Sequence, residues 1–438
     1  MKIEDLYNKF LLMEEEKELF YRQEIGIYYW DVIRHSVFMA IYNENYNIKR
    51  EVATKISLKN KFKMISNEIL FFLKVLCNKY DYIALISERN RRESEVYDSF
   101  MDPILNTLSG KVLELSLFML NEIKYGKNYQ ILLRIIKKIY YKVNKKRIDS
   151  VFQALNNEIN DYFGLNIDIK QLMIKGILEF KIEEKYYLRL LKLVKPKKIF
   201  VTQDNIQKAI MQVANKLDIP ILEIQHGDAS YYHPLYHYSP NINYEHIKTL
   251  PKYFLTFSSY WGEQYPCEKI VIGKQICNGN SKDVISNEKT ICFILSLGNE
   301  EVLLQLAIAV AIILDDFSVY IKLHPYQINK LNEFRVKTQI YKNIYIVAIY
   351  EEFTKTLGYI ENFVCIKSTC VFEALQCNKK VFILKTMDYD YFSYAFNNNV
   401  YLIEDEKGII DNIYNKPQKY NLNYYDFNKK VDEIIMLE

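Results

Sequence analysis

Glycine and proline are scarce in this chain of 438 residues, at 12 and 9 respectively, which argues against long flexible linkers. The seven cysteines include no CxxC pair. A disulfide framework and a zinc site are therefore disfavoured, and reduced, mostly buried thiols are expected. A strong excess of one charge is also lacking, because the chain has 58 Lys and Arg and 54 Asp and Glu, which gives a net charge of +4. That balance is too weak to predict nucleic-acid binding.

Long apolar runs are missing as well. The longest, near 302–314, contains Gln305 and ends at two aspartates, well short of the roughly 20 residues that a membrane span requires. The first 20 residues carry four acidic side chains after position 12 and no small-residue cleavage pattern, unlike a secretory signal. A cytoplasmic protein without a membrane span of its own is expected.

Patterns typical of strands and helices alternate along most of the chain, which predicts parallel sheets with right-handed crossovers. The first 75 residues have helical periodicity, a charged loop is predicted at 88–95, and a turn at Asp102–Pro103. Strands are predicted at 80–87, 198–202, 220–224, 252–257, 269–272, 291–295, 319–323, 344–349, 363–366 and 380–384, with helices at 205–217, 300–314, 352–357, 369–376 and 425–437.

A polar break with two glycines at 273–290 separates two such alternating regions. We therefore predict an α/β protein of two Rossmann-like, doubly wound domains that face a cleft, with additional N-terminal helices. The predicted boundaries are 1–275 for the acceptor-side domain and 285–438 for the nucleotide-donor domain. Paired domains of this kind bind ligands in the cleft, at the carboxyl ends of their strands.

Several common catalytic motifs are absent, namely GxGxxG, GxxxxGK[ST], HExxH and GxSxG. Their absence weighs against a dinucleotide oxidoreductase, a P-loop ATPase, a zinc protease and an α/β-hydrolase. The remaining chemistry lies at the predicted strand ends.

Two strand ends of the second region carry phosphate-binding chemistry. Lys322 and His324 share one face of a strand that Pro325 terminates. This cation and imidazole suit a phosphate, although a solvent-facing pair at a sheet margin is the plain alternative. Ser368 and Thr369 follow the next such strand and open a helix, where hydroxyls either bind an anion or simply cap the helix.

Two further residues of this region extend the prediction. Glu373 lies one turn into the helix that Thr369 opens, within reach of a ribose hydroxyl. Gly298 separates a strand from a helix, and a glycine there permits the close approach of a phosphate.

The first region offers Gln225, His226 and Gly227 directly after a strand. Gly227 permits a sharp turn, and His226 would act as a base or donate to an anion; a loop histidine satisfied by the backbone is the alternative. Asp204 is either a general base or a helix N-cap. Charged side chains directly follow the first predicted strand, at Glu88, Arg89, Arg91 and Arg92. Of these, Arg89 and Arg92 would either bind an acidic substrate or remain solvated.

Residues 123–147 stand out because they contain nine Lys or Arg and no acid. Apolar residues recur there at helical spacing, at Ile131, Leu132, Ile135, Ile136 and Ile139. A basic amphipathic helix of this kind binds an anionic membrane surface, or else it packs its apolar stripe on the core. The first alternative predicts peripheral association with the inner face of the cytoplasmic membrane.

The sequence resembles GT-B-type glycosyltransferases of bacterial surface-polysaccharide assembly in three motifs. These are QHG after one strand, KLHP at the end of another, and STCVFEA at the start of a helix. The resemblance covers about residues 195–400. It is strongest to the capsule and lipopolysaccharide transferases that use CMP-activated Kdo or sialic acid. The CDP-glycerol-type polyol-phosphate transferases share the HG and HP elements.

The resemblance implies a GT-B-like fold, a nucleotide-activated sugar donor, a glycan or lipid-linked glycan acceptor, and no cofactor or metal. No nucleic-acid partner is expected. The acidic triplet that supplies the base in bacterial sialyltransferases is not found in the N-terminal half. The expected catalytic residues are His226 and Asp204; the donor-binding residues are Gly298, Lys322, His324, Pro325, Ser368, Thr369 and Glu373; the acceptor-binding residues are Gln225, Gly227, Arg89 and Arg92.

Four alternatives remain open at this point. A CDP-polyol phosphotransferase would use similar phosphate contacts and form a phosphodiester. A nucleotide-sugar 2-epimerase would turn over the donor without an acceptor. A non-catalytic scaffold of a polysaccharide-assembly complex would bind membrane through 123–147 and no nucleotide. RNA binding through the tyrosines interleaved in that segment is the fourth, and it leaves the two-domain cleft unexplained.

Overall fold

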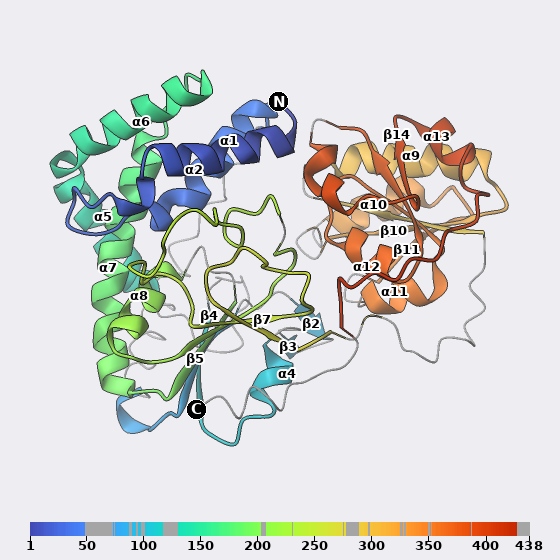
Figure 1. The fold of residues 1–438 in the computed structure, drawn as a ribbon. Helices are drawn as coiled ribbons and strands as arrows, with labels where there is room; N and C mark the ends of the chain where they lie inside the picture. Colours follow the sequence, from blue (N-terminus) through green and yellow to red (C-terminus); the bar gives the residue numbers. More distant parts are fainter. Residues whose placement is uncertain are drawn as a thin grey trace.

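The computed structural model describes residues 1–48, 73, 75–86, 90–92, 95–97, 101–116, 130–202, 207–229, 231–274, 276, 289–296, 298–324, 327, 330–348, 351, 353–386 and 388–426. Two parallel six-stranded sheets lie side by side, each flanked by helices (Figure 1). The chain therefore has the predicted α/β fold of two Rossmann-like domains in a GT-B-like arrangement.

The N-terminal sheet has the order β4-β1-β5-β6-β7-β8. Its central strands are short apolar runs buried on both faces, as a helix-covered parallel sheet requires. The strands are β1 (Tyr82–Ile86), β4 (Val112–Ser116), β5 (Lys198–Thr202), β6 (Ile221–Ile224), β7 (Tyr253–Thr256) and β8 (Glu268–Val271), and the helices α4 (Asp102–Leu105), α5 (Gln130–Asn144), α6 (Asp149–Phe163), α7 (Lys170–Val194) and α8 (Lys208–Lys216).

The C-terminal sheet has the order β11-β10-β9-β12-β13-β14. Strand order therefore reverses between β9 and β12, which lie side by side at the centre of the sheet. The strands are β9 (Thr290–Ile294), β10 (Ser318–Lys322), β11 (Ile344–Ile346), β12 (Asn362–Cys365), β13 (Lys380–Leu384) and β14 (Val400–Ile403), and the helices α9 (Glu300–Ile313), α10 (Leu331–Thr338), α11 (Phe353–Tyr359), α12 (Cys370–Gln376) and α13 (Glu406–Ile410).

The predicted N-terminal helices are present as α1 (Ile3–Glu16) and α2 (Trp30–Asn45), and they reach from the first domain to the second (Figure 1). The backbone N–H of Ile3 donates to Asp390 at 3.0 Å, and the Tyr46 hydroxyl donates to the same carboxylate at 3.0 Å. One apolar cluster runs through both domains, where the rings of Trp261 and Phe372 lie 4.9 Å apart. The domains are thus joined by packed side chains.

The chain passes from the N-terminal sheet to the C-terminal sheet between Val271 and Thr290. The predicted boundary at 276–284 lies mostly outside the described residues. The end of the described chain returns to the N-terminal domain. There the Asp426 N–H donates to the Phe257 carbonyl at 2.8 Å. The ring of Tyr425 also stacks on that of Phe257. Tyr425 and Asp426 therefore pack on the N-terminal domain, opposite to the one predicted for them.

Several expectations need correction. The charged loop at 88–95 includes a hairpin of β2 (Asn90–Arg92) and β3 (Glu95–Tyr97). The turn at Asp102–Pro103 is the first turn of α4, where proline needs no N–H partner. Tyr425 and Asp426 are not helical, and the rest of the predicted C-terminal helix lies outside the described residues. Cys377 is disulfide-bonded, against the expectation of reduced thiols, whereas Cys77, Cys267, Cys292, Cys365 and Cys370 remain thiols.

Candidate active site

The loops after β9 and β12 leave the C-terminal sheet at its switch point, where doubly wound sheets bind ligands. Gly298 lies in the first of these loops with a φ of +86°, and a Cβ there would meet no atom within 4 Å. Helix α9, with 14 residues, begins two positions later. The backbone thus leaves open space beside a helix N-terminus, which suits an anionic group.

The end of β10 is tied to this loop through a residue that the sequence did not single out. The His324 N–H donates to the Oε1 of Gln327 at 2.8 Å, and the Gln327 Nε2 donates to the Ser296 carbonyl at 3.3 Å. Gln327 is itself buried. The backbone that carries His324 is therefore fixed next to the loop of Gly298. Pro325 lies outside the described residues.

Lys322 does not extend into open space. Its Nζ donates to the carbonyl of Glu351 at 2.7 Å, and burial lowers the pKa of its ammonium despite the opposing effect of nearby acidic groups, Glu373 among them. The half-buried Lys322 ammonium is close enough to Glu373 for the two charges to interact. A direct contact of Lys322 with a ligand stays a prediction.

The loop after β12 contains the predicted hydroxyl pair. Ser368 Oγ accepts the N–H of Cys370 at 3.3 Å, whereas Thr369, the N-cap of the seven-residue α12, makes no side-chain capping bond. The carboxylate of Glu373 forms an ion pair of 2.6 Å with Lys274, from the segment that follows β8. Lys274 was not predicted. The segment between the domains thus joins the site through this ion pair.

The loop after β6 meets the loop after β12. Gln225 is fully buried, accepts the Phe257 N–H at 2.8 Å and donates to the Gly227 carbonyl at 2.9 Å, so its role here is to fix the loop. Gly227 has a φ of +75°, and a Cβ there would lie 3.8 Å from the methyl group of Thr369. Two predicted site residues from different domains therefore come together, with half-buried His226 beside them.

Lys367 is the most perturbed cation of this interface, and its neighbours were not predicted. Its Nζ lies 3.6 Å from the ring centre of Tyr391 and donates to the Tyr42 hydroxyl at 3.0 Å. That hydroxyl donates in turn to Asp388 at 3.1 Å. Burial lowers the pKa of Lys367 to about 8 against the carboxylates of Asp388, Asp228 and Asp390.

This depressed pKa predicts a pH dependence of stability. Between pH 8 and 10.5 the folded protein releases the Lys367 proton while the unfolded chain retains it. Stability of the wild type should therefore rise with pH relative to Lys367→Met, by about 3 kcal/mol at most, since each pKa unit is worth about 1.4 kcal/mol. Urea unfolding of both proteins at pH 7, 8, 9 and 10 measures the difference. A difference that is constant across this range would contradict the burial of a charged Lys367.

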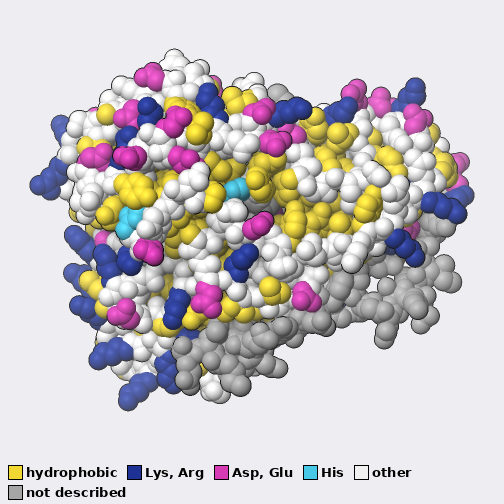
Figure 2. All heavy atoms as spheres, viewed as in Figure 1, with side chains coloured by type: hydrophobic (Ala, Val, Ile, Leu, Met, Phe, Trp, Pro, Cys, Tyr) yellow, Lys and Arg dark blue, Asp and Glu magenta, His cyan; other side chains and the backbone are white. Residues whose placement is uncertain are grey.

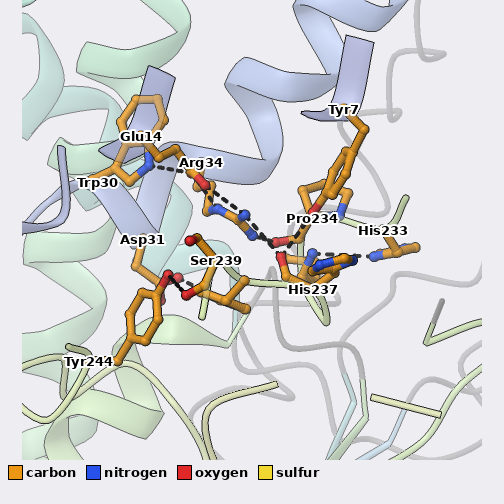
Figure 3. Close-up of polar contacts among 12 residues, drawn as sticks. Tyr7, Glu14, Trp30, Asp31, Arg34, His233, Pro234, His237, Ser239 and Tyr244 are labelled. Atoms are coloured by element: carbon orange, nitrogen blue, oxygen red, sulfur yellow. Dashed lines mark hydrogen bonds and ion pairs between the residues drawn. The ribbon is translucent and has the colours of Figure 1, made fainter. Parts of the chain in front are cut away.

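A buried ion pair supports the segment that follows the β6 loop (Figure 3). The Arg34 guanidinium binds Glu14 at 2.5 and 2.9 Å and donates to the carbonyls of Pro234 and, at 3.0 Å, His237. Trp30 donates to the same carboxylate at 2.6 Å. Helices α1 and α2 thus fix the backbone at 234–237.

The histidines of this segment are neutral. Burial lowers the pKa of His233 to about 3 and that of His237 to about 4, with Arg34 adding to the shift of both and Lys367 to that of His233. Beside them a cavity of about 290 Å³ opens at the carboxyl ends of β6 and β7. Its lining combines aromatic and polar groups and includes Tyr231, His237, Ser259, Tyr260, Glu263 and Asn423.

The structure does not describe the side chains of three other predicted site residues. Asp204 and Arg89 lie outside the described residues, and Arg92 lies in β2 with only its backbone described. Asp228 was overlooked although it directly follows Gly227, and its carboxylate is close enough to Lys367 to raise that pKa. The described side chains include no group of three or more His, Cys, Asp and Glu placed to hold a metal ion.

No family model matches the sequence, and no curated protein matches it either. Among solved structures, the chain is similar to the UDP-GlcNAc 2-epimerase of Methanocaldococcus jannaschii in complex with UDP-GlcNAc and UDP (TM-score 0.45, 12% identity, covering 81% of this chain and 98% of that one). It is also similar to MurG of Acinetobacter baumannii (0.43, 9%, 82% and 98%) and the spinosyn rhamnosyltransferase SpnG (0.38, 14%, 75% and 88%).

Proposed function

We propose that this protein is a glycosyltransferase that moves a sugar from a nucleotide-activated donor, a CMP-activated acidic sugar, to a bacterial capsule or lipopolysaccharide glycan. The observation that chiefly supports the proposal is the switch point of the C-terminal sheet. Open space beside Gly298 lies there with His324 and the Ser368–Thr369 pair on neighbouring strand ends. These groups suit the phosphate of a nucleotide, and Glu373 is proposed to bind its ribose.

In the proposed reaction an acceptor hydroxyl attacks the anomeric carbon of the donor. The bond between that carbon and the phosphate oxygen breaks, and the nucleotide leaves with the electron pair. Lys322 and His324 would stabilise the charge that develops on the leaving phosphate. The proton of the acceptor hydroxyl would pass to His226, on the loop that meets Thr369; Asp228 is a second candidate base, and Asp204 remains one from the sequence.

The acceptor would lie on the N-terminal side, beside Gln225 and Gly227. The cavity of about 290 Å³ next to this loop is of a size for one or two sugar units, and its tyrosines offer flat apolar faces among polar groups. Arg89 and Arg92 are proposed for an acidic portion of the acceptor. A lipid-linked acceptor would lie at the inner face of the cytoplasmic membrane, so we propose that the enzyme works there as a peripheral protein.

Analysis of the reaction product tests this proposal against its rivals. Purified protein is incubated with CMP-Kdo, CMP-sialic acid or CDP-glycerol and with lipopolysaccharide or capsule fragments, and the products are examined by mass spectrometry. We expect an acidic sugar in an acid-labile glycosidic bond and free CMP. A phosphodiester-linked polyol would instead establish the phosphotransferase, and turnover of donor alone would point to an epimerase. No turnover and no nucleotide binding, in the wild type and in His324→Ala alike, would support the scaffold.

A further inference from the structure

Helix α5 uses one face to pack on α7 and leaves a second, apolar face exposed. Its inner face includes buried Leu133, an ion pair between Lys137 and Glu183, and a hydrogen bond from the Tyr141 hydroxyl to the Gln171 side chain at 2.6 Å. The exposed fractions of four apolar residues on the other face are 46% for Ile135, 49% for Ile136, 59% for Ile139 and 70% for Val143. The predicted apolar stripe therefore does not pack on the core at Ile135, Ile136 and Ile139.

An apolar groove continues this face onto α7. It has a volume of about 430 Å³ and lies between the two helices, with Ile136 and exposed Leu193 in its wall. Apart from Lys185 and Arg189, the remaining lining is apolar or aromatic. Exposed apolar area on α5 and the groove together form one surface, defined by Ile135, Ile136, Ile139, Val143 and Leu193, which we term the α5 face.

Cations border the α5 face. On a helical projection, Lys138 and Lys142 lie on the exposed flank of the apolar stripe, one turn apart, and Lys146 and Arg147 lie in the 3-10 turn (Lys145–Arg147) that follows α5. Glu183, an acidic residue near the face, is paired with Lys137. In Figure 2 a row of Lys and Arg follows the edge of the N-terminal domain where Figure 1 places α5 and α7.

We propose that the α5 face binds the surface of an anionic bilayer, with the isoleucines and Val143 between the lipid headgroups and with Lys138, Lys142, Lys146 and Arg147 on lipid phosphates. Apolar side chains flanked by cations are the composition that interfacial helices use. A second copy of the same face would oppose like charges, which disfavours self-association. Within the described ranges, no helix combines the length and apolarity that crossing a membrane requires.

The position of the α5 face fits catalysis at a membrane. Helices α5 and α7 lie at the edge of the N-terminal domain that is remote from the C-terminal domain (Figure 1). A bilayer bound there lies away from the C-terminal domain, which carries the proposed donor site. That membrane binding would serve catalysis rests on the proposed function. Membrane binding by the α5 face is inferred only from the exposure and charge of its side chains.

Co-sedimentation with vesicles tests the proposal. The full chain is mixed with vesicles of phosphatidylcholine alone or with added phosphatidylglycerol, at low and high salt. We expect binding to the anionic vesicles that weakens with salt. Each lysine near an anionic surface contributes roughly fivefold in partitioning, so Lys138→Glu with Lys142→Glu should weaken binding by at least about 25-fold. Ile139→Gln with Val143→Gln should weaken it by at least about tenfold.

Matched variants on the other domain serve as controls. Val336 and Ile340 are 65% and 73% exposed and share the spacing of Ile139 and Val143, so Val336→Gln with Ile340→Gln should leave vesicle binding unchanged. Lys416→Glu with Lys419→Glu controls for net charge. Equal loss in test and control variants, or equal binding to neutral vesicles, would overturn the proposal, as would a dimer in sedimentation velocity that the α5 variants dissolve. Nucleotide binding in solution, measured on the same proteins, reports separately on the proposed function.

Discussion

Replacing Arg34 with Met is expected to lower the free energy of unfolding by about 3–5 kcal/mol. Both members of the Arg34–Glu14 pair are buried, with side-chain exposures of 1% and 0%. Removal of the guanidinium leaves the Glu14 carboxylate in an apolar environment that already raises its pKa. It also removes a donor from the carbonyls of Pro234 and His237. Urea unfolding followed by circular dichroism at pH 7 measures the change.

Two comparisons isolate the cause of this loss. Lys337→Met removes a cation that pairs with Glu301 and Glu333 at the surface, and it should cost less than about 1 kcal/mol. The double replacement of Arg34 by Met and Glu14 by Leu should recover part of the loss, because it leaves no charge unpaired in the core. A cost below 1 kcal/mol for Arg34→Met would show that this pair does not fix the 234–237 backbone.

Gly298→Val is expected to weaken nucleotide binding by about 10- to 100-fold, the equivalent of 1–3 kcal/mol of overpacking. The glycine leaves open space beside the N-terminus of α9. A valine side chain would occupy the volume that we assign to the donor phosphate. Isothermal titration with the nucleotide that the wild type prefers measures the loss.

Gly164→Val is the matched control for this prediction. Gly164 also has a positive φ, of +66°, and a Cβ there would likewise meet no atom within 4 Å. Each substitution forces a branched residue into the left-handed region at a cost of roughly 1–2 kcal/mol. Only Gly298→Val should affect the nucleotide. Comparable losses in the two variants would mean that backbone strain, not occupation of the site, weakens binding.

The sequence was most informative where the signal is local. β5 and β9 are short apolar runs that match their predicted ranges within a residue. Gly227 and Thr369 were each predicted from their place after a strand, and in the structure a Cβ added at Gly227 would lie 3.8 Å from the methyl group of Thr369. Parallel strands explain this success, because their carboxyl ends, and hence their loops, share one edge of the sheet.

Contacts distant in the sequence were not predictable in this way. Arg34 pairs with Glu14 across two helices and with carbonyls 200 residues away, and nothing in its local pattern marks it as buried. Lys274 lies in a polar segment that predicts a linker, yet it pairs with Glu373. Helix α7 has no prediction because charged and apolar residues mix along its 25 residues. Asp228, in contrast, directly follows the QHG motif and could have been found.

Nucleotide binding by the purified protein tests the central claim most directly. Thermal unfolding is recorded with CMP, CDP, UDP, GDP and ADP, for the wild type and His324→Ala. A nucleotide at 100 times its dissociation constant should stabilise the folded protein by about 2.7 kcal/mol. We predict stabilisation by CMP in the wild type and its loss in the variant. Stabilisation by none of the five nucleotides would contradict the assignment of the switch point as a donor site.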